Sequence, residues 1–123
     1  MRVIVCGSRR NVELRQVYRR LDDIHASTPI TTIVHGASQG GADNLAESWA
    51  RATGVPVERY PAAWRKLGSR AGPVRNAEMA ASGADLCVAF WNGESPGTLD
   101  MVRQALKRDV PVQLWPTIAL GPR

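Results

Sequence analysis

The chain has 123 residues, of which 44% are hydrophobic and 22% are charged, a composition typical of one globular domain rather than a disordered chain. No apolar run approaches the ~20 residues needed to cross a bilayer, and the first residues do not form a signal peptide. We therefore predict a single domain over residues 1–123 and a cytoplasmic location. The formal net charge of +5 leaves both nucleotide and nucleic-acid partners open.

The side chains that most often bind metals or form disulfides are scarce. Two cysteines, Cys6 and Cys87, lie inside apolar runs, and there are only two histidines. We expect buried thiols, no metal ion and no bound cofactor. Fourteen of the sixteen basic residues are arginine, whose planar guanidinium suits phosphate, although a GC-rich genome gives the same bias.

Strand and helix patterns alternate along the chain. Five short β-rich runs predict strands at residues 3–6, 31–35, 55–60, 86–91 and 110–115. Apolar residues at helical spacing predict helices from about 12 to 26, from 42 to 50, from 73 to a stop at Gly83, and from 98 to 106. This order predicts a three-layer α/β/α Rossmann-like domain with a mainly parallel five-stranded sheet. We interpret the one long connection, residues 61–72, as a functional loop.

Glycine, small hydroxyl and arginine residues follow the predicted strands. Ligands of open parallel sheets bind beyond the carboxyl ends of the strands, so these residues are expected to meet at one edge. The residues that we predict to bind a ligand are Gly7, Ser8 and Arg9 after the first strand, Gly36, Gly40, Gly41 and Asp43 after the second, Trp64 in the long connection, Arg75 and Asn76 on the third helix, and Gly93, Gly97 and Thr98 after the fourth strand.

The physical reason for this prediction is the affinity of glycine-rich helix starts for anions. Glycine lets the backbone approach a phosphate closely, and the free N–H groups of a helix's first turn point at it. Structural roles compete for several residues. Asp43 could instead offset a helix dipole, and Ser8 and Thr98 could be helix N-caps. Trp64 could pack the long loop against the domain. His35 at the end of a buried strand is interpreted as a structural histidine.

Three segments carry a resemblance to a known family: HGASQGGADNLAESWA (35–50), PAAWRKLGSRAGPVRNAEM (61–79) and ADLCVAFWNGESPGTLDMVRQA (84–105). They resemble the YspA-like branch of the SLOG superfamily, which also contains the Lonely Guy cytokinin-activating enzymes and the DprA DNA-processing proteins. The resemblance implies a Rossmann-like fold and a site for nucleotides or nucleotide-derived signals. The residues that fall on the family's pocket motifs are Gly36, Gly40, Asp43, Arg75, Asn76, Gly97, Thr98 and Asp100.

The resemblance to the Lonely Guy enzymes is incomplete at one position. Those enzymes cleave the N-glycosidic bond of nucleoside monophosphates with an arginine and a glutamate, and Arg75 matches the arginine. The glutamate of their PGGxGTxxE motif is replaced by Met101, and Asp100 lies one residue earlier. If the protein is an enzyme, Arg75 and Asp100 are its candidate catalytic residues.

Three functions follow, in order of preference. The first is binding of a nucleotide or nucleotide-derived ligand of the NAD or ADP-ribose type, as a sensor or binding protein. The second is a phosphoribohydrolase-like nucleotide N-glycosidase. The third is single-stranded nucleic-acid binding, ranked last because the arginines are dispersed and only 6% of residues are aromatic. We expect a small-molecule partner, no membrane partner and, by resemblance, a homo-oligomer. Trp115, Ile118 and Leu120 in the tail are candidates for its interface, or alternatively fold back onto the sheet.

Overall fold

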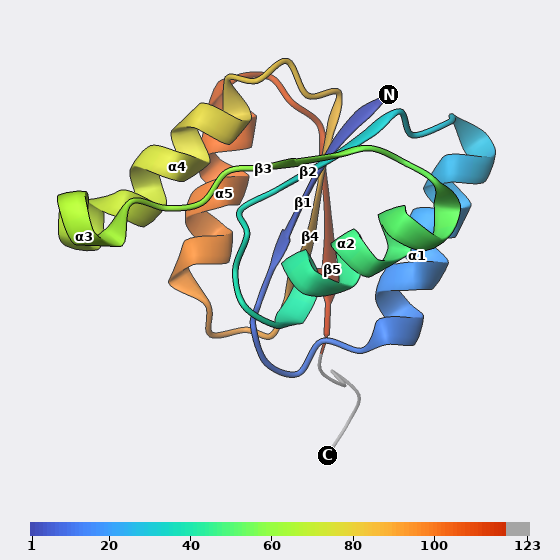
Figure 1. The fold of residues 1–123 in the computed structure, drawn as a ribbon, viewed down its shortest axis with the longest axis horizontal. Coiled ribbons are helices and arrows are strands. Elements are labelled where there is room, and N and C mark those ends of the chain that lie inside the picture. The colour runs from blue at the N-terminus through green and yellow to red at the C-terminus, as the bar shows by residue number, and fades with distance from the viewer. Residues whose placement is uncertain (118–123) are drawn as a thin grey trace.

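The computed structural model describes residues 1–117 and shows one five-stranded sheet between helices (Figure 1). Its elements in chain order are β1 (Arg2–Gly7), α1 (Leu14–Ser27), β2 (Thr32–His35), α2 (Gly41–Thr53), β3 (Val57–Arg59), α3 (Trp64–Leu67), the 3-10 turn η1 (Gly68–Arg70), α4 (Ala71–Ala80), β4 (Leu86–Trp91), α5 (Pro96–Lys107) and β5 (Val112–Pro116). The strand order is β3-β2-β1-β4-β5 and every pair is parallel. The predicted fold class is confirmed.

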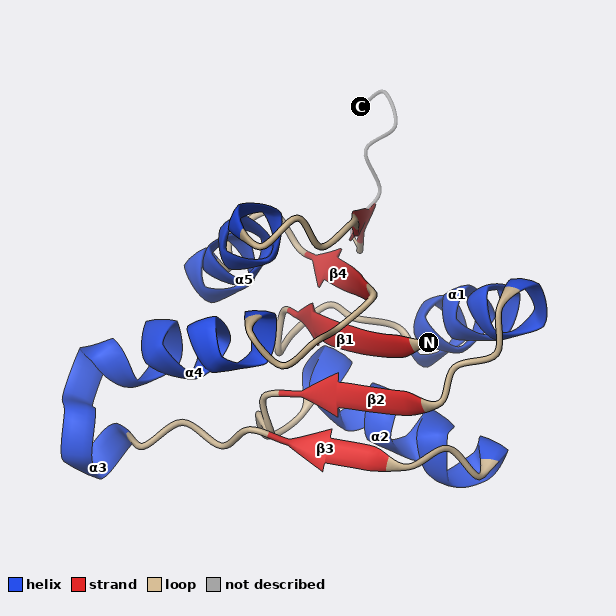
Figure 2. Ribbon diagram, turned by 90° about the horizontal axis from the view of Figure 1, so that it is seen from above, coloured by secondary structure: helices blue, strands red, loops and turns tan. Residues whose placement is uncertain are grey.

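The sheet is covered on both faces because its central strands are apolar throughout. Val3 and Val5 of β1 belong to the core shared with α1 and α2, whereas Ile4 and Cys6 belong to the core shared with α4 and α5. This alternation follows from the two-residue period of a strand. Figure 1 shows the two helical layers on either side of the sheet, and Figure 2 shows the strands side by side from β3 to β4.

The chain segment from residue 61 to 72 differs from the prediction of a loop. It contains the short helix α3 and the turn η1, and α4 begins at Ala71 rather than at Pro73. A proline is tolerated there because the first-turn N–H groups of a helix have no intrahelical partner. The buried Ala71 and Gly72 add packing contacts that polarity patterns do not reveal.

The predicted core residues occupy the expected interior. Trp49 is fully buried, and its Nε1 donates a hydrogen bond to Asp22 Oδ1 at 2.8 Å. The two cysteines are free, buried thiols, and their Sγ atoms lie 3.9 Å apart in the layer of α4 and α5. Hydrogen bonding to Cys87, together with burial, raises the pKa of the Cys6 thiol well above its usual value. The Cys6 thiol is therefore protonated at neutral pH.

The sheet ends at the edge strand β5. Trp115 on this strand is partly buried, and the guanidinium carbon of Arg20 lies 3.6 Å from the centre of its ring. The other two interface candidates, Ile118 and Leu120, lie outside the described residues, and the homo-oligomer stays a prediction. Within residues 1–117, no helix combines the length and the apolar character that a membrane crossing requires.

Candidate functional site

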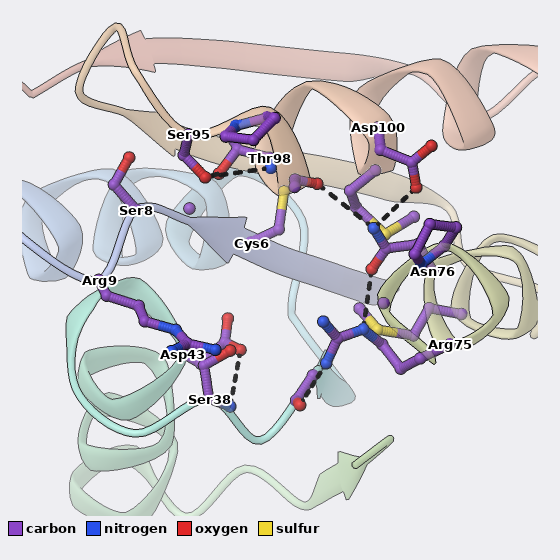
Figure 3. A pocket seen from close by; sticks show the side chains of 18 of the residues that line it. Cys6, Ser8, Arg9, Ser38, Asp43, Arg75, Asn76, Ser95, Thr98 and Asp100 are labelled. Atoms are coloured by element: carbon purple, nitrogen blue, oxygen red, sulfur yellow. Dashed lines mark hydrogen bonds between the residues drawn. The ribbon is translucent and has the colours of Figure 1, made fainter. Parts of the chain in front are cut away.

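A cavity of about 610 Å³ opens at the carboxyl edge of the sheet (Figure 3). It lies between the loops that follow β1 and β4, and the loop after β2 forms a third wall. The chain proceeds outward from β1 to β2 and β3 on one side and then returns to β4 on the other side. Such a reversal of strand order leaves a crevice between the two central strands, which is where open α/β sheets bind ligands.

The structure brings most of the predicted site residues together around this cavity. Those that line it are Gly7, Ser8, Arg9, Gly36, Asp43, Trp64, Arg75, Asn76, Gly97, Thr98 and Asp100. Three predicted residues do not line it, namely Gly40, Gly41 and Gly93. Lining residues that we did not select from the sequence are Cys6, Arg10, Ser38, Ser69, Gly72, Pro73, Met79, Asn92, Glu94, Ser95, Pro96 and Met101. Ser95 and Pro96 could have been identified from the sequence as the start of a helix, because serine followed by proline is common there.

Ser8 joins the loops that form the base of the cavity. Its hydroxyl accepts a hydrogen bond from the Asn92 amide at 2.9 Å, and its own amide donates to the Phe90 carbonyl at 2.9 Å. The interpretation of Ser8 as a helix cap is wrong, because α1 begins later, at Leu14, with Glu13 at the cap position. The fully enclosed hydroxyl of Ser8 instead holds the loop after β1 against the loop after β4.

The glycines before α2 allow two backbones to touch. Gly41 has a φ of +66°, and a Cβ placed there would lie 2.2 Å from the Ser8 carbonyl oxygen. The same carbonyl accepts a hydrogen bond from the Ala42 amide at 3.2 Å. We expected the amides at this helix start to face a ligand, but the Ala42 amide is used within the protein. Gly40 and Gly41 therefore shape the loop without lining the cavity.

The start of α5 does face the cavity. Ser95 is the N-cap: its Oγ accepts a hydrogen bond from the Thr98 amide at 3.3 Å and another from the Thr98 hydroxyl at 2.9 Å. The interpretation of Thr98 as the cap is wrong by three residues, because α5 starts at Pro96. Gly93, which was also predicted to bind the ligand, does not line the cavity. It has a φ of +90° and lies in a turn in which Asn92 Oδ1 accepts a hydrogen bond from the Glu94 amide at 2.9 Å. The positive end of the α5 dipole points at the site.

A continuous chain of hydrogen bonds runs across the cavity wall from β2 to α5. Arg75 Nη1 donates to the Gly36 carbonyl at 2.5 Å, and Arg75 Nε donates to Asn76 Oδ1 at 2.8 Å. Asn76 Nδ2 then donates to Asp100 Oδ2 at 3.0 Å. A Cβ at Gly36 would lie 2.3 Å from Arg75 Nη1, so a side chain there would displace the guanidinium from this position. Figure 3 shows these side chains converging from α4 and α5.

The aromatic side chain at the mouth of the cavity is Trp64 on α3. It is 51% exposed, and a Cβ at Gly72 would lie 3.3 Å from its ring. The tryptophan lines both the main cavity and an adjoining cavity of about 310 Å³. A half-exposed indole between two cavities provides an open face for stacking.

Asp43 places a carboxylate inside the cavity. The side chain is 6% exposed, and Oδ2 accepts a hydrogen bond from the Ser38 amide at 3.1 Å. Burial raises the pKa of Asp43 above its ordinary value, whereas the Ser38 amide opposes that shift. The charge of this carboxylate is therefore sensitive to what enters the cavity.

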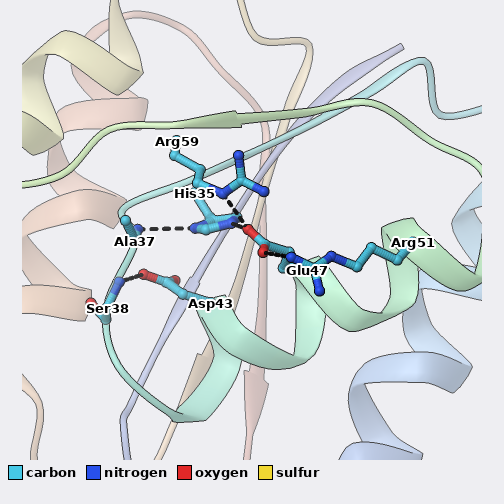
Figure 4. Close-up of polar contacts among 7 residues, drawn as sticks. All are labelled: His35, Ala37, Ser38, Asp43, Glu47, Arg51 and Arg59. Atoms are coloured by element: carbon cyan, nitrogen blue, oxygen red, sulfur yellow. Dashed lines mark hydrogen bonds and ion pairs between the residues drawn. The ribbon is translucent and has the colours of Figure 1, made fainter.

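A polar network behind the cavity fixes the loop after β2 (Figure 4). His35 Nδ1 accepts the Ala37 amide at 2.9 Å, and His35 Nε2 lies 2.9 Å from Glu47 Oε1. Because Nδ1 accepts, the neutral ring carries its hydrogen on Nε2 and donates it to Glu47. Arg59 and Arg51 also bond the Glu47 carboxylate, at 2.6 and 2.9 Å. The buried His35 is thus the structural histidine that we predicted.

The fold and the cavity define a Rossmann-like domain with a candidate ligand site at the crevice of a parallel sheet. The model of the YspA, cpYpsA-related SLOG family matches residues 1–67. The Gene 61 protein of Mycobacterium phage D29 is 40% identical over 117 residues, covering 90% of this chain and 93% of that protein. The chain therefore belongs to the YspA, cpYpsA-related SLOG family, and this membership indicates nucleotide-related ligand binding in general. No solved structure matches the chain.

The contact between Gly41 and the loop after β1 gives a prediction for stability. Gly41→Ala forces a Cβ against the Ser8 carbonyl. At Gly54, whose φ of +79° is also positive, an added Cβ would meet nothing within 4 Å. We expect Gly54→Ala to lower the free energy of unfolding by about 1–2 kcal/mol, from backbone strain alone. Gly41→Ala should cost about 1–3 kcal/mol more, from overlap. Urea unfolding of both variants measures the difference, and equal losses would show that the contact is unimportant.

The ion pairs of Glu47 predict how stability depends on pH. Hydrogen bonding to Arg59 lowers the pKa of Glu47 from 4.5 to about 2 in the folded protein. The ionised carboxylate therefore stabilises the fold above about pH 4.5, and this contribution is lost as the pH falls toward about 2. In urea titrations, Glu47→Gln should be less stable than the parent at pH 7, and the gap should close at pH 2. Glu78→Gln, which removes an exposed carboxylate, serves as the control. A stability difference between Glu47→Gln and the parent that does not change with pH would contradict the lowered pKa of Glu47.

Proposed function

We propose that this protein binds a nucleotide or a nucleotide-derived ligand of the NAD or ADP-ribose type as a sensor or binding protein. The observation that carries the proposal is the cavity of about 610 Å³ at the crevice between β1 and β4, with arginine side chains and the start of α5 on its walls. Arginine forks and helix starts are the groups that proteins use most for phosphate.

The two arginines of the cavity differ in what they are free to do. Arg9 is exposed and lines both cavities. Arg75 uses Nε and Nη1 within the protein, and its Nη2 forms no hydrogen bond with residues 1–117. Arg75 also makes no ion pair with a carboxylate in that part of the chain. No direct ion pair therefore neutralises its positive charge, although Asp43 lies within electrostatic range, and this favours an anionic ligand.

The size and shape of the site support a ligand larger than phosphate alone. The main cavity and the adjoining one, of about 310 Å³, share Arg9, Gly36, Ser38, Trp64 and Arg75. Volumes of roughly 300–1,000 Å³ are usual for ligands of nucleotide size. A base stacked on Trp64 with its phosphate toward α5 would use both the aromatic and the positive parts of the site.

Binding can be tested by calorimetry with AMP, ADP-ribose and NAD. A ligand at 100 times its dissociation constant should raise the free energy of unfolding by ~2.7 kcal/mol. Arg9→Gln should weaken binding by about tenfold, since a charge-assisted hydrogen bond contributes roughly 1.5 kcal/mol. Arg65→Gln, an exposed arginine of α3 that lines neither cavity, should leave the affinity unchanged. Absence of binding by all three ligands would refute the proposal.

A second candidate function, nucleotide N-glycosidase, is favoured by the hydrogen-bond chain of Arg75, Asn76 and Asp100. In this reaction water attacks the anomeric carbon, the C–N bond breaks, and the leaving base takes up the proton that the water gives up. Arg75 would hold the phosphate or ribose, and Asp100 would activate the water or stabilise the developing positive charge. Met101, which stands at the enzymes' glutamate position, is buried in the core and supplies no acid.

The enzymatic candidate makes its own prediction. The wild-type protein should release free base from AMP, and Asp100→Asn should lower the rate by about 100-fold or more. Asp23→Asn removes an exposed carboxylate of α1 and should have no effect. Chromatography of the reaction mixture measures the base. If neither AMP nor NAD releases any base, the protein only binds its ligand.

A further inference from the structure

Asp43 is the most buried of three carboxylates in the cavity, the others being Glu94 and Asp100, and three arginines line the same cavity. It stands in the first turn of α2, is 6% exposed and lines the cavity with Arg9 and Arg75. An ionised carboxylate only accepts hydrogen bonds and repels phosphate. Its presence among phosphate-binding groups therefore points to a part of the ligand that donates hydrogen bonds.

One oxygen of Asp43 is already fixed by the protein. Oδ2 accepts a hydrogen bond from the Ser38 amide at 3.1 Å, and Figure 4 shows this bond between Asp43 on α2 and Ser38 in the loop after β2. The Ser38 hydroxyl also interacts with this carboxylate. Among residues 1–117, however, no hydrogen bond of normal geometry reaches Oδ1, and Oδ1 is not a buried atom that lacks a partner. The open side of Asp43 is the cavity that it lines, so Oδ1 is available to a molecule there.

The carboxylate is also held rigidly in place. The Ala37 amide is tied to His35, and Ala37 has a φ of +58°. The start of α2 is locked by the contact of Gly41 with Ser8. A hydrogen-bonding group fixed in this way discriminates strongly, because a ligand that lacks the matching group leaves it unpaired.

We propose that Asp43 is a specificity-determining residue that accepts hydrogen bonds from the ribose hydroxyls of the ligand, so that the site selects ribonucleotides over 2′-deoxyribonucleotides. This inference rests on the proposed function. The ribose diol is the part of a nucleotide that offers two adjacent hydroxyl donors, and a carboxylate oxygen can accept from both. Burial, which raises the pKa of Asp43, is compensated when such hydroxyls bond the ionised form.

If the role of Asp43 is purely structural, a different effect of its substitution on ligand affinity is expected. A carboxylate that only offsets the α2 dipole changes stability, and it alters the affinities for ribo and deoxy ligands by the same factor. The ratio of the two affinities therefore separates the roles. A general change in the electrostatic attraction of phosphate alters both affinities equally, so it does not change their ratio.

The experiment compares dissociation constants of AMP and NAD with those of their 2′-deoxyadenosine analogues, by calorimetry on the full chain. The wild-type protein should favour the ribose form by at least about tenfold, the value of one hydrogen bond to a charged group. In Asp43→Asn the ratio should fall toward one, mainly through weaker binding of the ribose form. Glu78→Gln removes one exposed carboxylate that does not line the cavity and should keep the wild-type ratio.

The possible outcomes are distinct. Equal binding of ribose and deoxyribose forms by the wild-type protein, or an unchanged ratio in Asp43→Asn, overturns the role of Asp43 and leaves nucleotide binding intact. Absence of binding by AMP and NAD and by both analogues removes the inference together with the proposed function. If Asp43→Asn does not fold, Asp43→Glu, which keeps the charge but moves it by one methylene, should lower the ratio as well; an unchanged ratio there also overturns the proposal.

Discussion

The candidate site depends on three loops being held together at one edge of the sheet, and Ser8 is the residue that does this. Its hydroxyl, amide and carbonyl each make a hydrogen bond, to the loop after β4, to β4 itself and to the start of α2. All three groups are satisfied, as buried polar groups in native structures are. Without these bonds, neither the wall that carries Asp43 nor the α5 start would be fixed relative to β1.

The sequence was sufficient to predict the architecture and the edge at which the cavity lies. Strand alternation with helical spacing has few solutions, and the right-handed crossover rule leaves a parallel sheet. The same logic placed Asp43, Arg75 and Thr98 at one edge, because the residues that follow parallel strands share that edge. The orientation of side chains within the cavity, such as the link from Arg75 to Gly36, depends on contacts 39 residues apart in sequence and was not predictable.

The predictions that were wrong depend on residue types that serve more than one structural role. Glycines before a helix serve either a ligand or a close backbone contact, and only the position of Ser8 reveals that Gly41 serves the contact. Ser8 and Thr98 both suit a helix cap by residue type, yet Ser95 is the cap of α5. The short elements α3 and η1 were not predicted. They have four and three residues, and so few residues show no apolar periodicity that separates a helix from a loop.

The contact between Gly36 and Arg75 has a consequence for how such a sequence can evolve. The guanidinium occupies the space that any side chain at Gly36 would need, and the carbonyl of Gly36 is its hydrogen-bond acceptor. A larger residue at position 36 therefore requires either another position of the Arg75 guanidinium or a shorter side chain at position 75. The residues tolerated at these two positions are therefore coupled, although one position follows β2 and the other lies on α4.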